Sequence, residues 1–224
     1  MSMQRLLVVE GEEDKKFFEA VFRSMGRADQ VEIRHHPSGK SNAIKLFGDK
    51  LGLLTRASKA MVGLAIDADD PALNASDGFP NTRQSVNHQL QQRSFNALAM
   101  GVGTTGFLAT ANHLADVVTG LWVMPDNHAN GYLEDFANSV AAFSEQDQKA
   151  FALTVSTSVL NGSHGGPKFA FKAHHLPKAT VGTWLAWSDP PRMNLGTAVS
   201  RGLLDLQHPA FLSLIAWLNL LYFS

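Results

Sequence analysis

Two short stretches of the sequence share one arrangement, an apolar run that ends in acidic side chains. In LLVVEG, at residues 6–11, four apolar residues lead into Glu10 and Gly11. In MVGLAIDADDP, at residues 61–71, a second run ends in three acids: Asp67, Asp69 and Asp70. Carboxylates that gather in one place repel one another unless a cation neutralises them or one keeps a proton. Mg²⁺ and Mn²⁺ prefer such oxygen ligands, so the two stretches predict one shared metal site, with Gly11 allowing a tight turn beside it.

The segments around these acids predict an α/β fold. Residues 6–10, 31–35 and 61–66 have the length and apolar content of buried strands, and residues 13–25 and 41–57 between them have helical spacing. This alternation is typical of an α/β fold with a mainly parallel sheet flanked by helices. In such sheets the working site lies outside the carboxyl ends of the strands, where Glu10 and Asp67 are expected.

Each acid also has a plainer interpretation. Glu10 could cap a helix, and Asp14 suits the first turn of a helix, where acids interact well with the helix dipole. Asp69 and Asp70 precede Pro71 and could be turn residues. The metal interpretation expects Asp67 and Asp69 to point to the same side, because side chains alternate along an extended chain.

The rest of the chain is expected to form one globular unit with this core. We predict a core over residues 1–125 and a packed C-terminal α/β elaboration over residues 126–224. The predicted elements are a polar helix at 79–93, loops around short structure at 101–113, a strand at 117–124, helices at 131–143 and 145–160, a loop at 161–168, a late strand at 179–187 and a buried closing helix in the final run, 209–224.

Further acids and one lysine stand close to predicted element ends. Asp126 and Glu134 follow the strand at 117–124 and could extend the acidic site, although turn and helix-start chemistry also explain them. Gly39-Lys40-Ser41 suggests a phosphate loop, but the motif needs glycine where Arg34 stands, so that interpretation is rejected. Lys40 at a helix start could still meet a phosphate.

Basic residues collect late in the chain. Residues 164–201 hold five Lys or Arg and one acid, against a net charge of −1 for the whole protein. The lysines that could contact phosphates are Lys168, Lys172 and Lys178. An ordinary solvated surface is the alternative interpretation.

Composition excludes several classes of protein. The sequence has no cysteine, which excludes disulfides, zinc–cysteine sites and a cysteine nucleophile, and fits a cytoplasmic location. No secretory signal is recognisable at the start. The apolar final run is short for a membrane span, so no membrane partner is expected.

At its acidic motifs the chain resembles a known superfamily. Val9-Glu10-Gly11 with Asp14, followed by Asp67-Ala68-Asp69, resembles the two motifs of Toprim domains. The segments LWVMPDNHANGYLEDF and PKATVGTWLAWSDPP resemble small standalone Toprim-like proteins related to the overcoming-lysogenization-defect nucleases. The resemblance implies a Toprim-like core over roughly residues 5–125 and covers most of the chain more loosely.

The resemblance implies an activity and roles for single residues. Glu10, Asp67 and Asp69 would be the catalytic acids, and these three with Asp14 would hold Mg²⁺ or Mn²⁺. The expected function is metal-dependent cleavage of phosphodiester bonds in DNA or RNA, with a separate ATPase subunit as a partner. The alternative is a non-catalytic Toprim-fold regulatory or interaction module.

Overall fold

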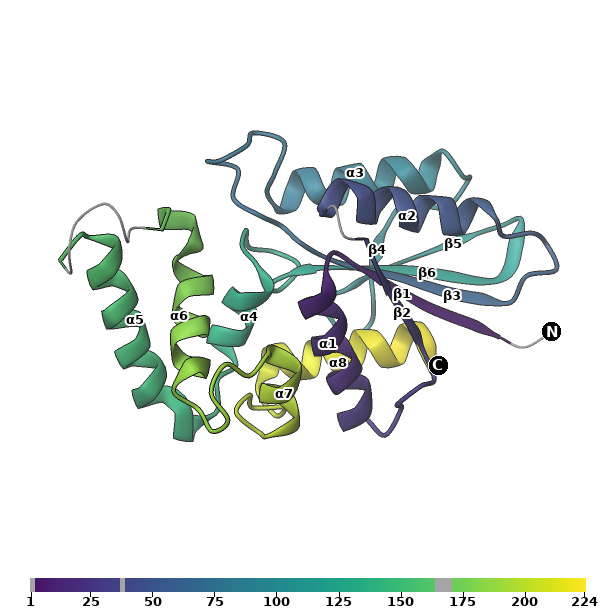
Figure 1. The fold of residues 1–224 in the computed structure, drawn as a ribbon. Helices are drawn as coiled ribbons and strands as arrows, with labels where there is room; N and C mark the ends of the chain where they lie inside the picture. The colour runs from purple at the N-terminus through teal and green to yellow at the C-terminus, as the bar shows by residue number, and fades with distance from the viewer. Residues whose placement is uncertain (1–2, 37–38, 164–170) are drawn as a thin grey trace.

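The centre of the molecule is a sheet of six strands (Figure 1). The computed structural model describes residues 3–36, 39–163 and 171–224. In chain order the strands are β1 (Gln4–Val9), β2 (Glu32–His35), β3 (Ala60–Asp67), β4 (Ala99–Met100), β5 (Phe107–Ala111) and β6 (Leu114–Met124). They lie in the order β2-β1-β3-β6-β5-β4; the first four run parallel to one another, and β5 pairs antiparallel with both of its neighbours, β6 and β4. The predicted α/β fold with a mainly parallel sheet is confirmed.

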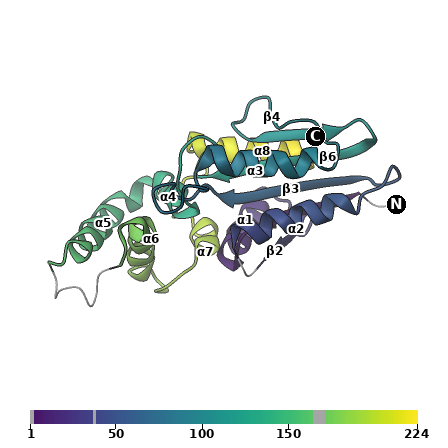
Figure 2. The same ribbon diagram turned by 90° about the horizontal axis from the view of Figure 1, so that it is seen from above.

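Helices cover both faces of this sheet. The α-helices are α1 (Glu12–Ser24), α2 (Lys40–Gly52), α3 (Phe79–Gln91), α4 (Leu133–Ser139), α5 (Gln146–Leu160), α6 (Leu176–Ala186), α7 (Leu195–Ser200) and α8 (Pro209–Tyr222), with short 3₁₀ turns η1 (Phe143–Glu145) and η2 (Ala173–His175). Helices α2 and α3 lie on one face, and α1 and α8 on the other (Figures 1 and 2). Helices α4, α5 and α6 extend beyond one end of the sheet (Figure 1).

The two faces bury two separate apolar cores, and β1 shows why. Leu6 and Val8 pack into the core under α2 and α3. Leu7 and Val9 pack into the core formed with α1 and α8. Because successive side chains of a strand point to opposite faces, a strand covered on both faces needs a continuous apolar run. The first acid can therefore appear only where the strand leaves the core, which is the position of Glu10.

The apolar final run forms the predicted buried helix, α8. Its Trp217 and Tyr222 are fully buried, and the Tyr222 hydroxyl donates a hydrogen bond of 2.8 Å to the Leu6 carbonyl oxygen. A side chain on Gly63 of β3 would collide with Tyr222 and Leu221, so the sheet approaches this helix at a glycine. Within the described part of the chain, no helix is both long enough and apolar enough to cross a membrane.

The prediction of a late strand at 179–187 is wrong, because residues 179–186 lie in α6 and Trp187 follows the end of this helix. Its buried residues Val181, Trp184 and Leu185 are spaced by three and one, which places them on one side of a helix. Pro177 in the first turn is also a common helix-start residue. β-Branched and aromatic side chains give the segment a strand-like composition, but helical packing decides its structure.

The C-terminal elaboration also needs correction. Among the described residues beyond β6 there are helices and isolated bridges but no further strand of the sheet. This part is therefore helical rather than α/β. The predicted loop region at 101–113 contains β5, and the predicted helix at 131–143 is the shorter α4.

Candidate functional site

Glu10 and Asp67 lie side by side at the carboxyl edge of the sheet. Glu10 directly follows β1 and Asp67 ends β3, and these two strands are parallel neighbours. Glu10 Oε1 accepts a hydrogen bond of 2.9 Å from the Asp67 backbone N–H. Asp67 is only 8% exposed, and its Oδ1 accepts a hydrogen bond of 2.8 Å from the Leu133 N–H at the start of α4. The carboxyl group of Glu10 thus reaches the backbone of Asp67, and two acids far apart in sequence become neighbours where the first core strands end.

Asp14 and Glu134 add two more acids around this pair. We call the group the open cluster: Glu10, Asp14, Asp67 and Glu134. Burial raises the pKa of Glu10 to about 8, with repulsion from Asp69 and Asp14 adding to it. Burial, and then repulsion from Glu134, raises the pKa of Asp14 to about 6. Burial and the charge on Glu10 also raise the pKa of Asp67 well above its ordinary value. The three acids are therefore unfavourable when all are charged at once, and binding a proton or a cation would relieve this.

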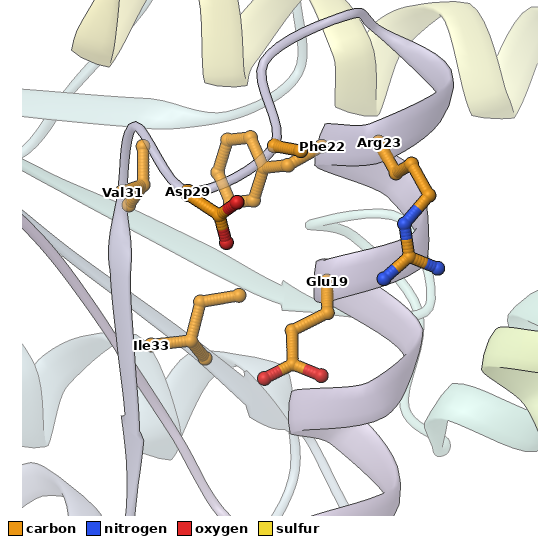
Figure 3. Close-up of a pocket in the computed structure, with 7 residues that line it drawn as sticks. Glu19, Phe22, Arg23, Asp29, Val31 and Ile33 are labelled. Atoms are coloured by element: carbon orange, nitrogen blue, oxygen red, sulfur yellow. The ribbon is translucent and has the colours of Figure 1, made fainter.

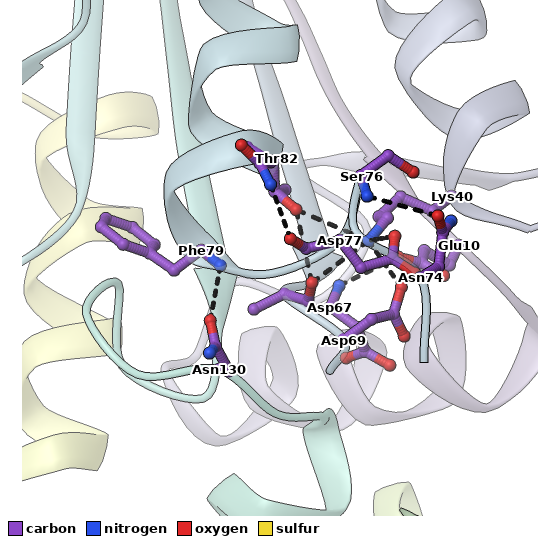
Figure 4. A network of polar contacts seen from close by, with 12 residues as sticks. Glu10, Lys40, Asp67, Asp69, Asn74, Ser76, Asp77, Phe79, Thr82 and Asn130 are labelled. Atoms are coloured by element: carbon purple, nitrogen blue, oxygen red, sulfur yellow. Dashed lines mark hydrogen bonds and ion pairs between the residues drawn. The ribbon is translucent and has the colours of Figure 1, made fainter. Parts of the chain in front are cut away.

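Asp69 has a different environment from Asp67, although only one residue separates them. Its φ of 61° is left-handed, a conformation that aspartate tolerates better than most residues. The strand alternation expected over 67–69 therefore stops after Asp67. Asp69 instead pairs with Lys40, whose Nζ lies 2.6 Å from Asp69 Oδ2 and 2.7 Å from Asp77 Oδ1 (Figure 4). We call Lys40, Asp69 and Asp77 the lysine cluster.

The remaining predicted acids serve turns. Asp70 Oδ1 accepts a hydrogen bond of 2.9 Å from the Ala72 N–H. Asp126 Oδ1 accepts hydrogen bonds of 2.9 and 2.7 Å from the N–H groups of His128 and Ala129. Both contacts match the turn chemistry that the sequence offered as the alternative interpretation.

One of the predicted lysines reaches the open cluster. Lys178 Nζ, from α6, lies 3.3 Å from Glu134 Oε1. Lys172 is exposed at the start of η2. Lys168 lies outside the described residues. The basic segment at 164–201 therefore places at least one positive charge, that of Lys178, beside the acids at the carboxyl edge of the sheet.

Sequence reasoning missed Asp77. It stands in DGFP, where Gly78 and a proline in the first turn mark the start of α3. An acid at this position looks like an ordinary helix-start residue, so the sequence gives no sign of its contact with Lys40. Thr82, also missed, is 2% exposed, and its hydroxyl donates a hydrogen bond of 3.4 Å to the Ala68 carbonyl oxygen. Only the folded loop between β3 and α3 brings these residues to Lys40.

The oxygen-only donor set of the open cluster suits a hard divalent cation. As the side chains stand, no three His, Asp or Glu groups among the described residues form a ready ligand set. An ion would have to draw the carboxylates inward. The pKa values of Glu10, Asp14 and Asp67 are raised mainly by burial and in part by repulsion between the acids, so a bound cation would favour their charged forms and such a rearrangement.

A separate hollow lies on the other half of α1. It has a volume of about 230 Å³ and lies between the second half of α1 and the segment that leads into β2 (Figure 3). Glu19, Arg23 and Asp29 line it. Asp14 belongs to the first turn of the same helix, so this hollow is distinct from the acidic edge.

Comparison with known proteins places the chain in one family. No curated protein and no solved structure gives a significant match. Residues 4–223, nearly the whole chain, match the family described as "Protein of unknown function (DUF3226)". The chain belongs to this family.

Proposed function

We propose that this protein is a Mg²⁺- or Mn²⁺-dependent enzyme that cleaves phosphodiester bonds in nucleic acid, with a Toprim-type active site. One observation carries the proposal: Glu10 and Asp67 meet at the ends of neighbouring parallel strands, each with a raised pKa. Buried acids with shifted pKa values are common at catalytic sites. The resemblance of the same residues to the Toprim motifs supports the same activity.

The open cluster and Asp69 would hold the ion. Glu10, Asp14, Asp67 and Asp69 are the proposed ligands, and Glu134 is an additional acid from α4. Because Lys40 Nζ occupies Asp69 Oδ2, Asp69 would reach the ion through its other carboxylate oxygen. A bound divalent ion would supply a water of lowered pKa and offset charge on the phosphoryl oxygens. Without metal the pKa of Glu10 is about 8, and a bound cation would favour its carboxylate form, so Glu10 would hold the ion or act as a general acid or base in proton transfer. Its Oε1 receives the Asp67 N–H, which leaves Oε2 for that role.

The substrate would meet the site on its basic side. Lys178 lies at the rim of the open cluster, and Lys172 precedes α6 on the same segment. We propose that these lysines, with Lys168, contact backbone phosphates. Because few lysines are involved, binding should be weak and salt-sensitive, with a log–log salt slope of about −0.9 for each phosphate neutralised on duplex DNA. A separate ATPase partner and a cytoplasmic location belong to the same proposal.

A second candidate function is a regulatory or interaction module that keeps the fold without catalysis. The lysine cluster favours it, because Lys40 already neutralises Asp69, one of the proposed catalytic acids. In that case the acidic edge would stabilise the loop between β3 and α3 and would turn over no substrate.

Nuclease assays on the purified chain distinguish the two functions. Single-stranded DNA, duplex DNA and RNA should be cleaved in Mn²⁺ or Mg²⁺, and a chelator should stop the cleavage. Asp67→Asn should lose activity, whereas Asp116→Asn should not, because Asp116 is an exposed acid in the first part of β6. If the chain binds Mn²⁺ yet stays inert on all three substrates, even with a candidate ATPase and ATP, the regulatory function is correct.

A further inference from the structure

The Lys40 ammonium lies in a cage of oxygen atoms. It is within 2.7 Å of carboxylate oxygens of both Asp69 and Asp77, and it donates to the Ala68 carbonyl oxygen at 3.2 Å. The Thr82 hydroxyl oxygen lies farther away, at 3.5 Å. An ammonium group has three donors, so these two carboxylates and one carbonyl satisfy all of them. The Lys40 side chain is only 14% exposed.

Side chains of the protein itself neutralise the positive charge of Lys40. The carboxylates of Asp69 and Asp77, at 2.6 and 2.7 Å, place two negative charges in direct contact with the ammonium of Lys40. The neighbouring acids are less completely paired: Lys178 pairs with Glu134, but among the ion pairs of the described residues none includes Glu10, Asp14 or Asp67.

We infer that Lys40 takes the place of one cation at the acidic edge, so that the site accepts a single divalent ion beside Glu10 and Asp67. This inference rests on the proposed function and specifies it further. A second ion on Asp69 and Asp77 would have to expel a buried ammonium from both of its carboxylates, which is costly because the ammonium would lose its compensating charges. Lys40 is thus a positioning residue. It neutralises and orients two acids but, unlike a metal ion, does not activate water.

Counting bound Mn²⁺ tests the inference without an activity measurement. Equilibrium dialysis or electron paramagnetic resonance of free Mn²⁺ gives the number of ions per chain at saturation. Wild type should bind one, and Lys40→Met should bind one more, because the two freed carboxylates then offer oxygen ligands. Lys40→Arg keeps the positive charge and should match wild type. Lys45→Met is the matched control, because it removes an exposed lysine from the same helix.

Two results overturn the inference: two ions in wild type, or the same number in wild type and Lys40→Met. A wild type that binds no ion instead contradicts the proposed function, and the difference between wild type and Lys40→Met still tests the role of Lys40. If Lys40→Met does not fold, Asp77→Asn serves as the test variant instead. It should fold, because Lys40 still pairs with Asp69. That variant should bind as many ions as wild type, and the loss of an ion would show that Asp77 serves the metal rather than the lysine.

Discussion

The open cluster and the lysine cluster lie at the same edge of the sheet and balance their charge in different ways. In the lysine cluster, an ammonium from α2 satisfies two aspartates at hydrogen-bonding distance. In the open cluster, no described lysine pairs with Glu10, Asp14 or Asp67, and their pKa values rise. The difference shows how neighbouring aspartates can divide structure and chemistry. Asp69 ties a loop to a helix, whereas Asp67 has no lysine at ion-pair distance among the described residues and favours a proton or an added cation.

The largest expected effect is on catalysis and is confined to the open cluster. Glu10→Gln should lower the rate of nucleic acid cleavage by about 10²–10⁴-fold, because a positioned proton donor or acceptor contributes that much. Asp77→Asn should retain most of the activity, since its carboxylate serves Lys40. Single-turnover cleavage rates in saturating Mn²⁺ measure both. Similar losses in the two variants would abolish the distinction between the clusters.

Metal binding should also separate the clusters. At 100 times the dissociation constant, a bound ion stabilises the folded protein by about 2.7 kcal/mol. For a chain of this size that corresponds to a rise in Tm of roughly 5–10 °C. Thermal melting with and without Mn²⁺ should show this rise for wild type and Asp116→Asn, and a much smaller one for Asp67→Asn. Equal rises in all three proteins would remove Asp67 from the ligand set.

The stability of the metal-free protein should fall as pH rises from about 4.5 to 8. The pKa of Glu10 is about 8 in the folded protein against an ordinary 4.5, so between these values the folded state binds the additional proton and stability decreases with pH. Asp14, with a pKa of about 6, adds to the decrease in the lower part of this range. Urea titrations across the range measure the slope. Glu10→Gln should reduce it without abolishing it, because Asp14 and Asp67 still contribute, and an unchanged slope in that variant would assign the effect to other groups.

Part of this site could be predicted from sequence, and the contrast between Asp67 and Asp69 explains the limit. Glu10 and Asp67 follow apolar runs, and parallel neighbouring strands bring such ends together, so their meeting follows from local pattern and fold class. The direction of Asp69 depends on one left-handed backbone conformation, which strand alternation does not predict. Asp77 reaches Lys40 only through the path of a loop, and loops carry no periodic signal. The prediction of a late strand at 179–187 is wrong because it relied on local composition, which is strand-like. The packing of Trp184 and Leu185, which composition does not show, makes the segment helical.

The smallest expected effect is on folding stability, and its sign should differ between the clusters. Asp67→Asn keeps an oxygen that can accept the Leu133 N–H and removes a charge that repels Glu10, so the free energy of unfolding of the metal-free protein at pH 8 should stay level or rise. Asp77→Asn weakens a charge-assisted hydrogen bond to Lys40 and should lower it by about 1–2 kcal/mol. Urea denaturation without metal measures both, with Asp116→Asn as the surface control, expected within about 0.5 kcal/mol of wild type. If Asp67→Asn were the more destabilised variant, Asp67 would be mainly a structural residue that holds the start of α4. The open cluster would then no longer be distinguished from the lysine cluster as the catalytic site.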